Sequence, residues 1–285
     1  MNIINDIQSI RQQIKCWKAD GLSVGFVPTM GNLHAGHLQL VEQAKHKADR
    51  VVVSIFVNPM QFNEVSDFSA YPRTLEEDAA LLKEVSADVL FLPADDELYP
   101  VDQVATTKVI VPGLGDILEG ECRPGHFTGV TTIVSKLFNI VQPDIACFGE
   151  KDFQQLMIIR RMVVELNSPV KIEAIATRRE ADGLAMSSRN NRLDNEQRAR
   201  APQIYQVLTG ISKALKAGNK DYSQLEQDAI ATLDARGFKT EYVTIRRSID
   251  LAMPMTDDSN LVVLLAARLG DIRLIDNVSL GLNPD

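Results

Sequence analysis

The sequence lacks the features that mark several large classes of protein. Only three of its 285 residues are cysteines, and Cys16, Cys122 and Cys147 are widely spaced. They form neither a disulfide framework nor a zinc-binding pattern, and they indicate reduced thiols in a cytoplasmic protein. No apolar run approaches the ~20 residues needed to span a bilayer. The polar, amphipathic N-terminus does not match a signal peptide.

Positive charge is also scarce. Lys and Arg number 30 against 38 Asp and Glu, which gives a formal net charge of −8. Because nucleic acids and anionic membranes favour a basic face, we expect the chain to bind neither. Two nucleotide-binding motifs are missing as well. The absence of G-x-G-x-x-G after a strand disfavours a pyridine-nucleotide dehydrogenase, and the absence of G-x-x-x-x-G-K-[ST] excludes a P-loop enzyme.

Strand and helix patterns alternate through the first 176 residues. This alternation predicts the α/β class, with a Rossmann-like, doubly wound parallel sheet. The expected strands are 24–27, 50–57, 88–92, 144–148 and 170–176, with an edge strand at 107–111. Helices are expected at 3–19, 130–141 and 153–166, and a further helix is expected to begin at Leu38. A Thr74–Glu77 capping box predicts the start of another helix, which runs to about 86. Loops are expected at 63–73 and 120–129.

The character of the sequence changes near residue 177. Residues 177–191 form a polar connector, and the capping pair Asp194 and Gln197 predicts a helix that reaches 217. A second helix is expected at 222–236, followed by strands at 239–246, 261–267 and 272–278. We therefore predict two domains, a Rossmann-like domain at 1–176 and a smaller α+β domain at 177–285.

The chain is organised around residues 23–38, SVGFVPTMGNLHAGHL, in which a strand runs into a tight turn and a helix N-terminus. We call residues 28–37 the signature turn. Free N–H groups and the positive dipole end of a helix attract phosphate, and glycines let the chain pass close to a ligand. The two histidines can donate to phosphate oxygens as negative charge builds up. The candidate nucleotide contacts here are Gly31, His34, Gly36 and His37.

Other polar segments follow strand ends, where doubly wound sheets bind ligands. Residues 58–62 (NPMQF) combine a neutral amide with an apolar wall. Residues 149–155 (GEKDFQQ) are either a surface helix cap or a phosphate site, in which the lysine neutralises charge and the aspartate contacts nucleotide or metal-bound water. Residues 186–190 (MSSRN) offer two hydroxyls and a guanidinium that suits phosphate. The loop 123–127 (RPGHF) is either a structural corner or a wall of the site.

Taken in order, PTMGNLHAGH, NPMQF, RPGHF, GEKDFQQ and DGLAMSSRN resemble the pantothenate synthetase (pantoate–β-alanine ligase) family of the His-x-Gly-His nucleotidyltransferase superfamily. LGDIRLIDN near the C-terminus is similar too. The resemblance implies ATP-dependent condensation of (R)-pantoate with β-alanine through a pantoyl adenylate, releasing AMP and pyrophosphate. It also implies a homodimer, Mg²⁺ carried mainly by ATP phosphates, ATP and pantoate binding by 1–176, and a lid role for 177–285.

The resemblance also assigns roles to individual residues. The implied catalytic groups are His34, His37, Lys151 and Arg189, with His37 as the candidate acid. The implied ATP-binding residues are Met30, Gly31, His34, Gly36, His37, Gly149, Lys151, Asp152, Arg178, Met186, Ser187, Ser188 and Arg189. The implied pantoate- and β-alanine-binding residues are Asn58, Gln61 and Gln155. Arg178 departs from the apolar character expected near adenine, and a contact through its backbone would accommodate the arginine.

Two other functions compete with this interpretation. A nucleotidylyltransferase that moves AMP onto a phosphorylated acceptor shares the signature turn, but its acceptor favours basic residues where Gln61 and Gln155 stand. A non-catalytic nucleotide sensor on the same fold is disfavoured by the presence of Lys151, Arg189 and both signature histidines.

Overall fold

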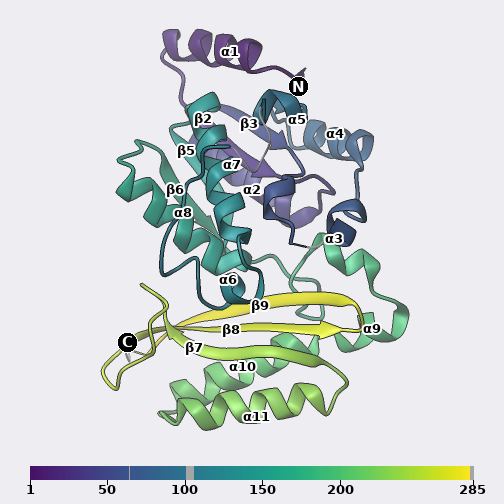
Figure 1. Ribbon diagram of the computed structural model, residues 1–285, viewed down its shortest axis with the longest axis vertical. Coiled ribbons are helices and arrows are strands. Elements are labelled where there is room, and N and C mark those ends of the chain that lie inside the picture. The colour runs from purple at the N-terminus through teal and green to yellow at the C-terminus, as the bar shows by residue number, and fades with distance from the viewer. Residues whose placement is uncertain (64, 101–105, 283–285) are drawn as a thin grey trace. The chain divides into compact units, whose positions relative to one another are not determined.

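The computed structural model describes residues 1–63, 65–100 and 106–282, which form two compact units (Figure 1). The first unit comprises Met1–Glu150 and Gln154–Ala176. The second comprises Lys151–Phe153 and the chain from Thr177 onward. The short stretch Lys151–Phe153 therefore groups with the second unit, although residues of the first unit flank it in sequence.

A six-stranded parallel sheet forms the centre of the first unit. Its strand order is β1-β4-β3-β2-β5-β6, and each pairing between neighbours is parallel. The strands are β1 (Asn2–Ile4), β2 (Val24–Thr29), β3 (Arg50–Ile55), β4 (Val89–Phe91), β5 (Ile145–Gly149) and β6 (Lys171–Ile175). The predicted α/β class and doubly wound parallel sheet are confirmed.

Helices cover both faces of this sheet, which explains why its central strands are apolar throughout. The helical segments up to β6 are α1 (Ile7–Ala19), α2 (Ala35–Lys47), η1 (Pro59–Gln61), α3 (Val65–Ser69), α4 (Leu75–Glu84), α5 (Asp95–Leu98), α6 (Glu119–Cys122), α7 (His126–Val141), η2 (Glu150–Asp152) and α8 (Phe153–Glu165). On one face Val41 of α2 and Leu82 of α4 pack in a core that includes Cys147, as expected for that cysteine. On the other face Phe138 of α7 packs edge-on against Phe26.

The strand order reverses between β2 and β5. These strands are neighbours in the sheet, but β2 leads through α2 to β3 on one side and β5 leads through α8 to β6 on the other. Such a switch point leaves a crevice outside the carboxyl ends of the strands, where ligands bind in open α/β sheets. Met30 and Glu150 begin the two segments that leave the sheet at this point.

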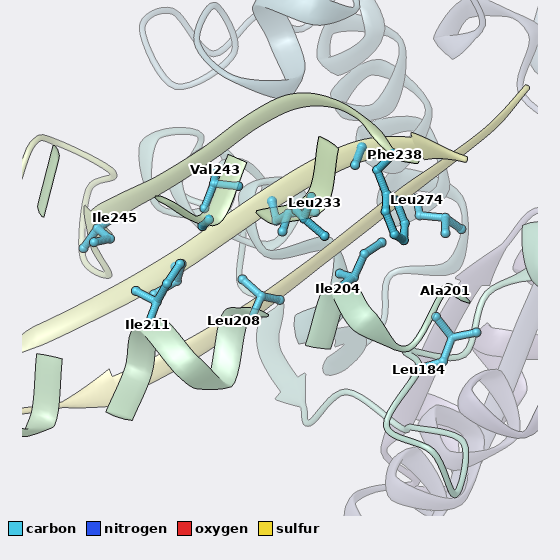
Figure 2. Packing of buried hydrophobic residues seen from close by; sticks show 14 of the residues in the cluster. Leu184, Ala201, Ile204, Leu208, Ile211, Leu233, Phe238, Val243, Ile245 and Leu274 are labelled. Carbon is cyan, nitrogen blue, oxygen red and sulfur yellow. The ribbon is translucent and has the colours of Figure 1, made fainter. Parts of the chain in front are cut away.

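The second unit is built on a three-stranded antiparallel sheet, in the order β7-β8-β9 (Figure 1). Its elements are η3 (Ser188–Arg192), α9 (Asn195–Arg200), α10 (Gln203–Lys216), α11 (Tyr222–Asp234), β7 (Lys239–Arg247), β8 (Asn260–Leu269) and β9 (Ile272–Gly281). Figure 2 shows Ile204, Leu208 and Ile211 of α10 directed toward the strands, in one apolar cluster with Val243 and Ile245 of β7. The predicted small α+β module is confirmed, and it has a core of its own.

The N-terminal helix begins later than predicted. Asn2–Ile4 form β1, which pairs with β4, and α1 starts at Ile7. Asp6 caps the helix, because its carboxylate accepts the backbone N–H of Ser9 at 2.7 Å. The apolar periodicity continues through Ile3, but pairing with β4 decides the conformation of this segment.

The expected edge strand at 107–111, a segment that the structure describes in full, does not form. The Val109 N–H donates to Thr132 Oγ1 at 3.0 Å, and the Val109 carbonyl accepts from Thr131 Oγ1 at 2.6 Å. Both threonines lie on α7. The segment therefore runs along a helix whose side chains take the hydrogen bonds that a neighbouring strand would have supplied.

Two helix starts also differ from the prediction. Thr74 is the N-cap of α4 but makes no side-chain capping bond, so the Thr74–Glu77 capping box is wrong. Its ψ of 48° departs from the extended backbone that aims an N-cap oxygen at the first turn. Helix α2 begins at Ala35 rather than at Leu38, because His34 caps it.

Further corrections concern segments predicted as single elements. The loops at 63–73 and 120–129 contain α3, part of α6 and the start of α7. Asp194 and Gln197 do form a capping box, but their helix ends at Arg200 and α10 starts after Pro202. Proline lacks the N–H that a continuous helix would need there. Among the described residues, no helix combines the length and apolar character required to cross a membrane.

Candidate active site

His34 and His37 form a reciprocal cap on the first turn of α2. His34 Nδ1 accepts the backbone N–H of Gly36 at 3.1 Å, and His37 Nδ1 accepts the backbone N–H of His34 at 3.3 Å. The two ring centroids are 4.1 Å apart. Because each Nδ1 accepts a hydrogen bond, a neutral ring carries its proton on Nε2. The cap thus sets both imidazoles in the tautomer whose Nε2–H can donate to an oxyanion.

A buried carboxylate supports the turn that leads into this cap. Asp78 is 2% exposed, and it accepts the backbone N–H of Asn32 through Oδ2 at 2.9 Å and that of Leu33 through Oδ1 at 2.7 Å. The turn requires positive φ at Gly31 (78°) and at Asn32 (50°). A Cβ at Gly31 would lie 3.0 Å from Asp78 Oδ2 and would strain the backbone. Asp78 therefore ties α4 to the signature turn.

Asn58 and Gln61 follow β3 and lie next to Met30. Asn58 is 1% exposed, and its Nδ2 donates to Gln61 Oε1 at 3.0 Å and to the Gly129 carbonyl at 3.1 Å. Its Oδ1 accepts from the Tyr99 hydroxyl at 2.7 Å. Gln61 Nε2 contacts Met30 Sδ at 3.0 Å. The structure thus brings three candidate site residues together, with both N–H groups of Asn58 engaged by the protein itself.

The RPGHF loop holds the backbone of Gln61. His126 Nδ1 lies 2.8 Å from the Gln61 carbonyl oxygen, and Arg123 Nη2 donates to the same oxygen at 3.2 Å. A carbonyl only accepts, so His126 Nδ1 carries a proton, and its Nε2, 3.2 Å from Arg123 Nη1, is the acceptor. These bonds make the loop a structural support for a candidate substrate-binding residue.

Lys151 and Asp152 follow β5 and lie in η2. Lys151 Nζ is 3.7 Å from Asp152 Oδ1, and the lysine side chain is 19% exposed against 47% for the aspartate. The Lys151 carbonyl accepts a hydrogen bond from Asn277 Nδ2, on β9, at 2.9 Å. The LGDIRLIDN stretch therefore contributes an anchor for the backbone of a candidate catalytic lysine, within the second unit.

The other candidate phosphate ligands also belong to the second unit. Ser187 caps η3 and accepts the backbone N–H of Arg189 at 3.3 Å. The Arg178 carbonyl accepts the Met186 N–H at 3.0 Å, whereas the Arg178 side chain is exposed. It is therefore the backbone of Arg178, and not its side chain, that bonds to the start of the Met186–Arg189 segment.

A buried ion pair anchors the start of this segment. Arg179 donates through Nη1 to Asp276 Oδ2 at 2.6 Å and through Nη2 to Oδ1 at 2.9 Å. Arg179 also donates to the Gly183 carbonyl at 3.1 Å, and its guanidinium lies 3.8 Å from the centroid of the Tyr205 ring. Burial raises the pKa of Asp276, and the hydrogen bonds and charge of Arg179 oppose that rise. The pair ties the residues before Met186 to β9.

The remaining candidates occupy the ends of elements. Gly149 is the last residue of β5, Gln155 lies half-buried in the first turn of α8, and Ser188 opens η3. Among the described residues, no group of three or more His, Cys, Asp or Glu side chains could hold a metal ion. Mg²⁺ prefers oxygen ligands and often binds through substrate phosphates with few carboxylates.

The sequence pattern indicated the RPGHF loop, but not the other residues that support the site. Asp78 ends an acidic run at a helix start, where an acid ordinarily signals only a favourable helix dipole. Tyr99 stands in a segment without a pattern. Asp276 and Asn277 did carry a signal, because both belong to LGDIRLIDN, which the family resemblance covers without giving it a role.

Comparisons with known proteins identify the family of the chain. A sequence model described as pantoate-beta-alanine ligase matches residues 2–279. The chain is 53% identical over 283 residues to the pantothenate synthetase of Methylococcus capsulatus and 51% identical over 282 residues to that of Nitrosococcus oceani, and 99% of each sequence is covered in both cases.

Solved structures give the same result. The fold is similar to the crystal structure of pantothenate synthetase from Thermus thermophilus, with a TM-score of 0.89, 41% identity and full coverage of both chains. It is also similar to pantoate-beta-alanine ligase from Francisella tularensis complexed with beta-gamma ATP and beta-alanine, with a TM-score of 0.83, 34% identity, and coverage of 98% of this chain and 97% of the other. The family resemblance of the motifs is confirmed over nearly the whole sequence, and the chain belongs to the pantoate–β-alanine ligase family.

Proposed function

We propose that the chain condenses (R)-pantoate with β-alanine to form pantothenate, with conversion of ATP to AMP and pyrophosphate. Family membership supports this reaction, as does the complex of the Francisella tularensis relative with beta-gamma ATP and beta-alanine. The observation that carries the proposal is the reciprocal histidine cap after β2, at the switch point of the sheet. Two Nε2–H donors at a helix N-terminus are suited to bind phosphate.

The reaction divides into two displacements. A carboxylate oxygen of pantoate forms a bond to the α-phosphorus of ATP, the bond to the bridging oxygen breaks, and pyrophosphate leaves. The amine of β-alanine then attacks the acyl carbon of pantoyl adenylate, loses a proton and expels AMP. Neither displacement requires a protein nucleophile, so the protein contributes positioning and stabilisation of charge.

The two histidines and two cationic side chains are proposed to stabilise the negative charge on the phosphates. His37 donates through Nε2 as negative charge develops, with His34 beside it in the same cap. Lys151 acts as a point charge, and Arg189 can offer two parallel N–H donors. The remaining ATP contacts are assigned to Met30, Gly31, Gly36, Gly149, Asp152, Arg178, Met186, Ser187 and Ser188.

Pantoate is assigned to Gln61 and Gln155, with Asn58 engaged in orienting Gln61. An amide can orient the acid and its hydroxyls through donors and acceptors on one group. A lysine would bind the carboxylate more strongly, but it would withdraw electron density from the attacking oxygen. Neutral glutamines therefore suit a carboxylate that must act as a nucleophile.

Mg²⁺ is proposed to accompany ATP, held mainly by the phosphates, where it would offset their charge. Asp152, whose side chain is 47% exposed, is the carboxylate assigned to a water in its coordination shell. Equilibrium dialysis should show little Mg²⁺ bound to the protein alone and about one equivalent more when ATP is present. Tight Mg²⁺ binding without ATP would contradict this assignment.

The second unit is proposed to act as a lid. An acyl adenylate hydrolyses when water reaches it, so synthesis requires that water be excluded. Deletion of 177–285 should leave weak nucleotide binding but little synthesis. A fully active truncated protein would refute the role.

A cytoplasmic homodimer is also proposed. The family resemblance supports the dimer, and the small number and wide spacing of the cysteines Cys16, Cys122 and Cys147 support a reducing compartment. Light scattering on the purified protein should give twice the 31.5 kDa mass of one chain. A mass of one chain at micromolar concentration would contradict the dimer.

Product analysis tests the proposed reaction. Incubation with ATP, Mg²⁺, (R)-pantoate and β-alanine should yield one AMP for each pantothenate, measured by mass spectrometry. Transfer of AMP to a phosphopantetheine acceptor in place of pantothenate formation would identify a nucleotidylyltransferase. ATP binding without either reaction would identify a nucleotide sensor.

A further inference from the structure

The side chain of Asn58 links Tyr99 to Gln61 within the first unit. Tyr99 follows α5 and is 7% exposed, and its hydroxyl lies 2.7 Å from Asn58 Oδ1. Its ring is held by Phe56, with centroids 6.1 Å apart, and by Lys136 Nζ, 5.1 Å from the ring centroid. Burial raises the pKa of the Tyr99 hydroxyl, so this group remains a hydrogen-bond donor at neutral pH.

The carbonyl of Gly129 identifies the donor atom of the Asn58 amide, and hence the direction of each hydrogen bond between Tyr99 and Gln61. A carbonyl only accepts, so the Asn58 atom that faces it at 3.1 Å must be Nδ2. The same Nδ2 faces Gln61, and the opposing atom of Gln61 is therefore Oε1. Gln61 Nε2 is then directed toward Met30 Sδ. In this orientation Asn58 Oδ1 faces Tyr99 and requires a donor.

The backbone of Gln61 is held by other contacts. A Cβ on Gly129 would lie 2.4 Å from the Met60 carbonyl oxygen, so α7 approaches η1 backbone to backbone. His126 and Arg123 both face the Gln61 carbonyl oxygen. With the backbone fixed, the main freedom left to Gln61 is the rotation and flip of its side-chain amide, which the bond from Asn58 restricts.

We propose that Tyr99 is a positioning residue for the acid substrate, because its hydroxyl holds Asn58 in the orientation that sets the amide of Gln61. The proposal rests on the assignment of Gln61 to pantoate. Without the hydroxyl, Asn58 Oδ1 would lie buried without its donor, and the amide would gain alternative orientations. Gln61 would then present N–H and C=O groups to the substrate interchangeably.

Tyr99→Phe removes only the hydroxyl, so it isolates this effect. We expect the KM for (R)-pantoate to rise about three- to tenfold, the range for loss of one buried hydrogen bond, while the KM for ATP stays within about twofold. Tyr222→Phe is the matched control, because the Tyr222 hydroxyl is buried and has no hydrogen-bond partner in the described residues. It should change neither constant.

A double-mutant cycle with Gln61→Ala separates the proposed effect of Tyr99 on Gln61 through Asn58, here called the relay, from general destabilisation of the fold. The relay predicts that Gln61→Ala raises the pantoate KM and that adding Tyr99→Phe in that background has no further effect. Fully additive effects, or equal rises in the KM for pantoate and ATP, would show that Tyr99 has only a structural role. A Tyr99→Phe enzyme that matches Tyr222→Phe would overturn the relay while leaving the Gln61 assignment intact.

The same experiment distinguishes a failure of the relay from a failure of the assignment of Gln61 to pantoate. If Gln61→Ala leaves the pantoate KM unchanged, the assignment of Gln61 to pantoate is wrong and the relay fails with it. The rise in melting temperature caused by (R)-pantoate provides a second measurement if a variant is poorly active. Tyr99→Phe should reduce this rise but leave the rise caused by ATP unchanged.

Discussion

The buried carboxylate of Asp78 accepts the backbone N–H of Asn32 at 2.9 Å, and so connects the first turns of α4 to the turn that ends in the histidine cap. Asn32 has a φ of 50°, which few residues adopt without support. The second carboxylate oxygen accepts the N–H of Leu33 at 2.7 Å. One acidic side chain therefore satisfies two amides of a strained turn, and the position of the signature histidines depends on it.

Asp78→Asn should weaken this turn. Asparagine keeps the size of the side chain, but it offers one oxygen and would place its NH₂ group against the second backbone N–H. We expect the free energy of unfolding to fall by about 1–3 kcal/mol and the KM for ATP to rise. Urea denaturation and steady-state kinetics measure the two effects. Glu77→Gln, at the exposed neighbouring carboxylate, should change neither, and equal effects of the two substitutions would contradict the role of Asp78.

Removal of one histidine of the cap tests its chemical contribution. His37→Ala should lower the rate of adenylate formation about 10²- to 10³-fold, as loss of one preorganised donor to a developing charge typically does. The measurement is a single-turnover assay with ATP and pantoate. His46→Ala is the control, since His46 is an exposed histidine on the same helix. Near wild-type activity of His37→Ala would remove His37 from the mechanism.

Gln155→Lys tests the argument for neutral pantoate ligands. The lysine should retain pantoate binding but slow its attack on ATP, because the positive charge lowers the nucleophilicity of the carboxylate. Calorimetry would report the affinity, and single-turnover kinetics the rate of adenylate formation. Gln206→Lys makes the same change of charge at an exposed position of α10 and should change neither the affinity nor the rate. An unchanged rate of adenylate formation in Gln155→Lys would contradict the need for a neutral ligand at this position.

The ion pair between Arg179 and Asp276 should contribute far more to stability than an exposed pair does. Its side chains are 17% and 3% exposed, compared with 37% and 41% for Arg198 and Asp182. Asp276→Asn leaves a buried guanidinium without its counter-charge, so we expect a loss of about 3–5 kcal/mol. Arg198→Gln should cost at most ~1 kcal/mol. Chemical denaturation of both variants measures the free energy of unfolding, and similar losses of this free energy in the two variants would contradict the argument from burial.

Cys147 should react with thiol reagents much more slowly than Cys16 and Cys122. Burial raises the pKa of the Cys147 thiol to about 11, so this thiol is protonated at pH 8, and its side chain is 1% exposed. The thiolate is the reactive form, and it becomes abundant only as the pH approaches that pKa. Titration with an aromatic disulfide at pH 8 should modify two thiols quickly and the third only after unfolding. Three rapid equivalents would contradict the buried position.

The sequence predicted the strands of the central sheet well, because their signal is local. Runs such as Val51–Val53 are apolar on both faces and end at turn residues, which a parallel, covered sheet requires. The prediction was wrong where tertiary contacts decide the conformation. Asn2–Ile4 pair with β4 instead of extending α1, and 107–111 bond to threonines of α7 instead of a strand. Neither partner can be identified from the local pattern.

The residues of the candidate site were likewise predicted where the signal is local and missed where distant contacts decide. Motifs predicted His34, His37 and Gln61 as candidate site residues, because a ligand site requires particular chemistry at a particular spacing. Asp78 and Tyr99 act through other residues: Asp78 lies 46 positions from Asn32 and Tyr99 lies 41 positions from Asn58. Long-range hydrogen bonds of this kind leave no periodicity and no short motif, so only the structure reveals them.

Exchange of labelled pyrophosphate into ATP measures formation of the pantoyl adenylate, the step on which the proposed reaction depends. The purified protein would be incubated with ATP, Mg²⁺ and labelled pyrophosphate, with (R)-pantoate present or absent and without any amine. We expect exchange only when pantoate is present, because adenylate formation is reversible and needs the acid alone. Exchange that does not depend on pantoate, or no exchange with it, would contradict a pantoyl adenylate intermediate.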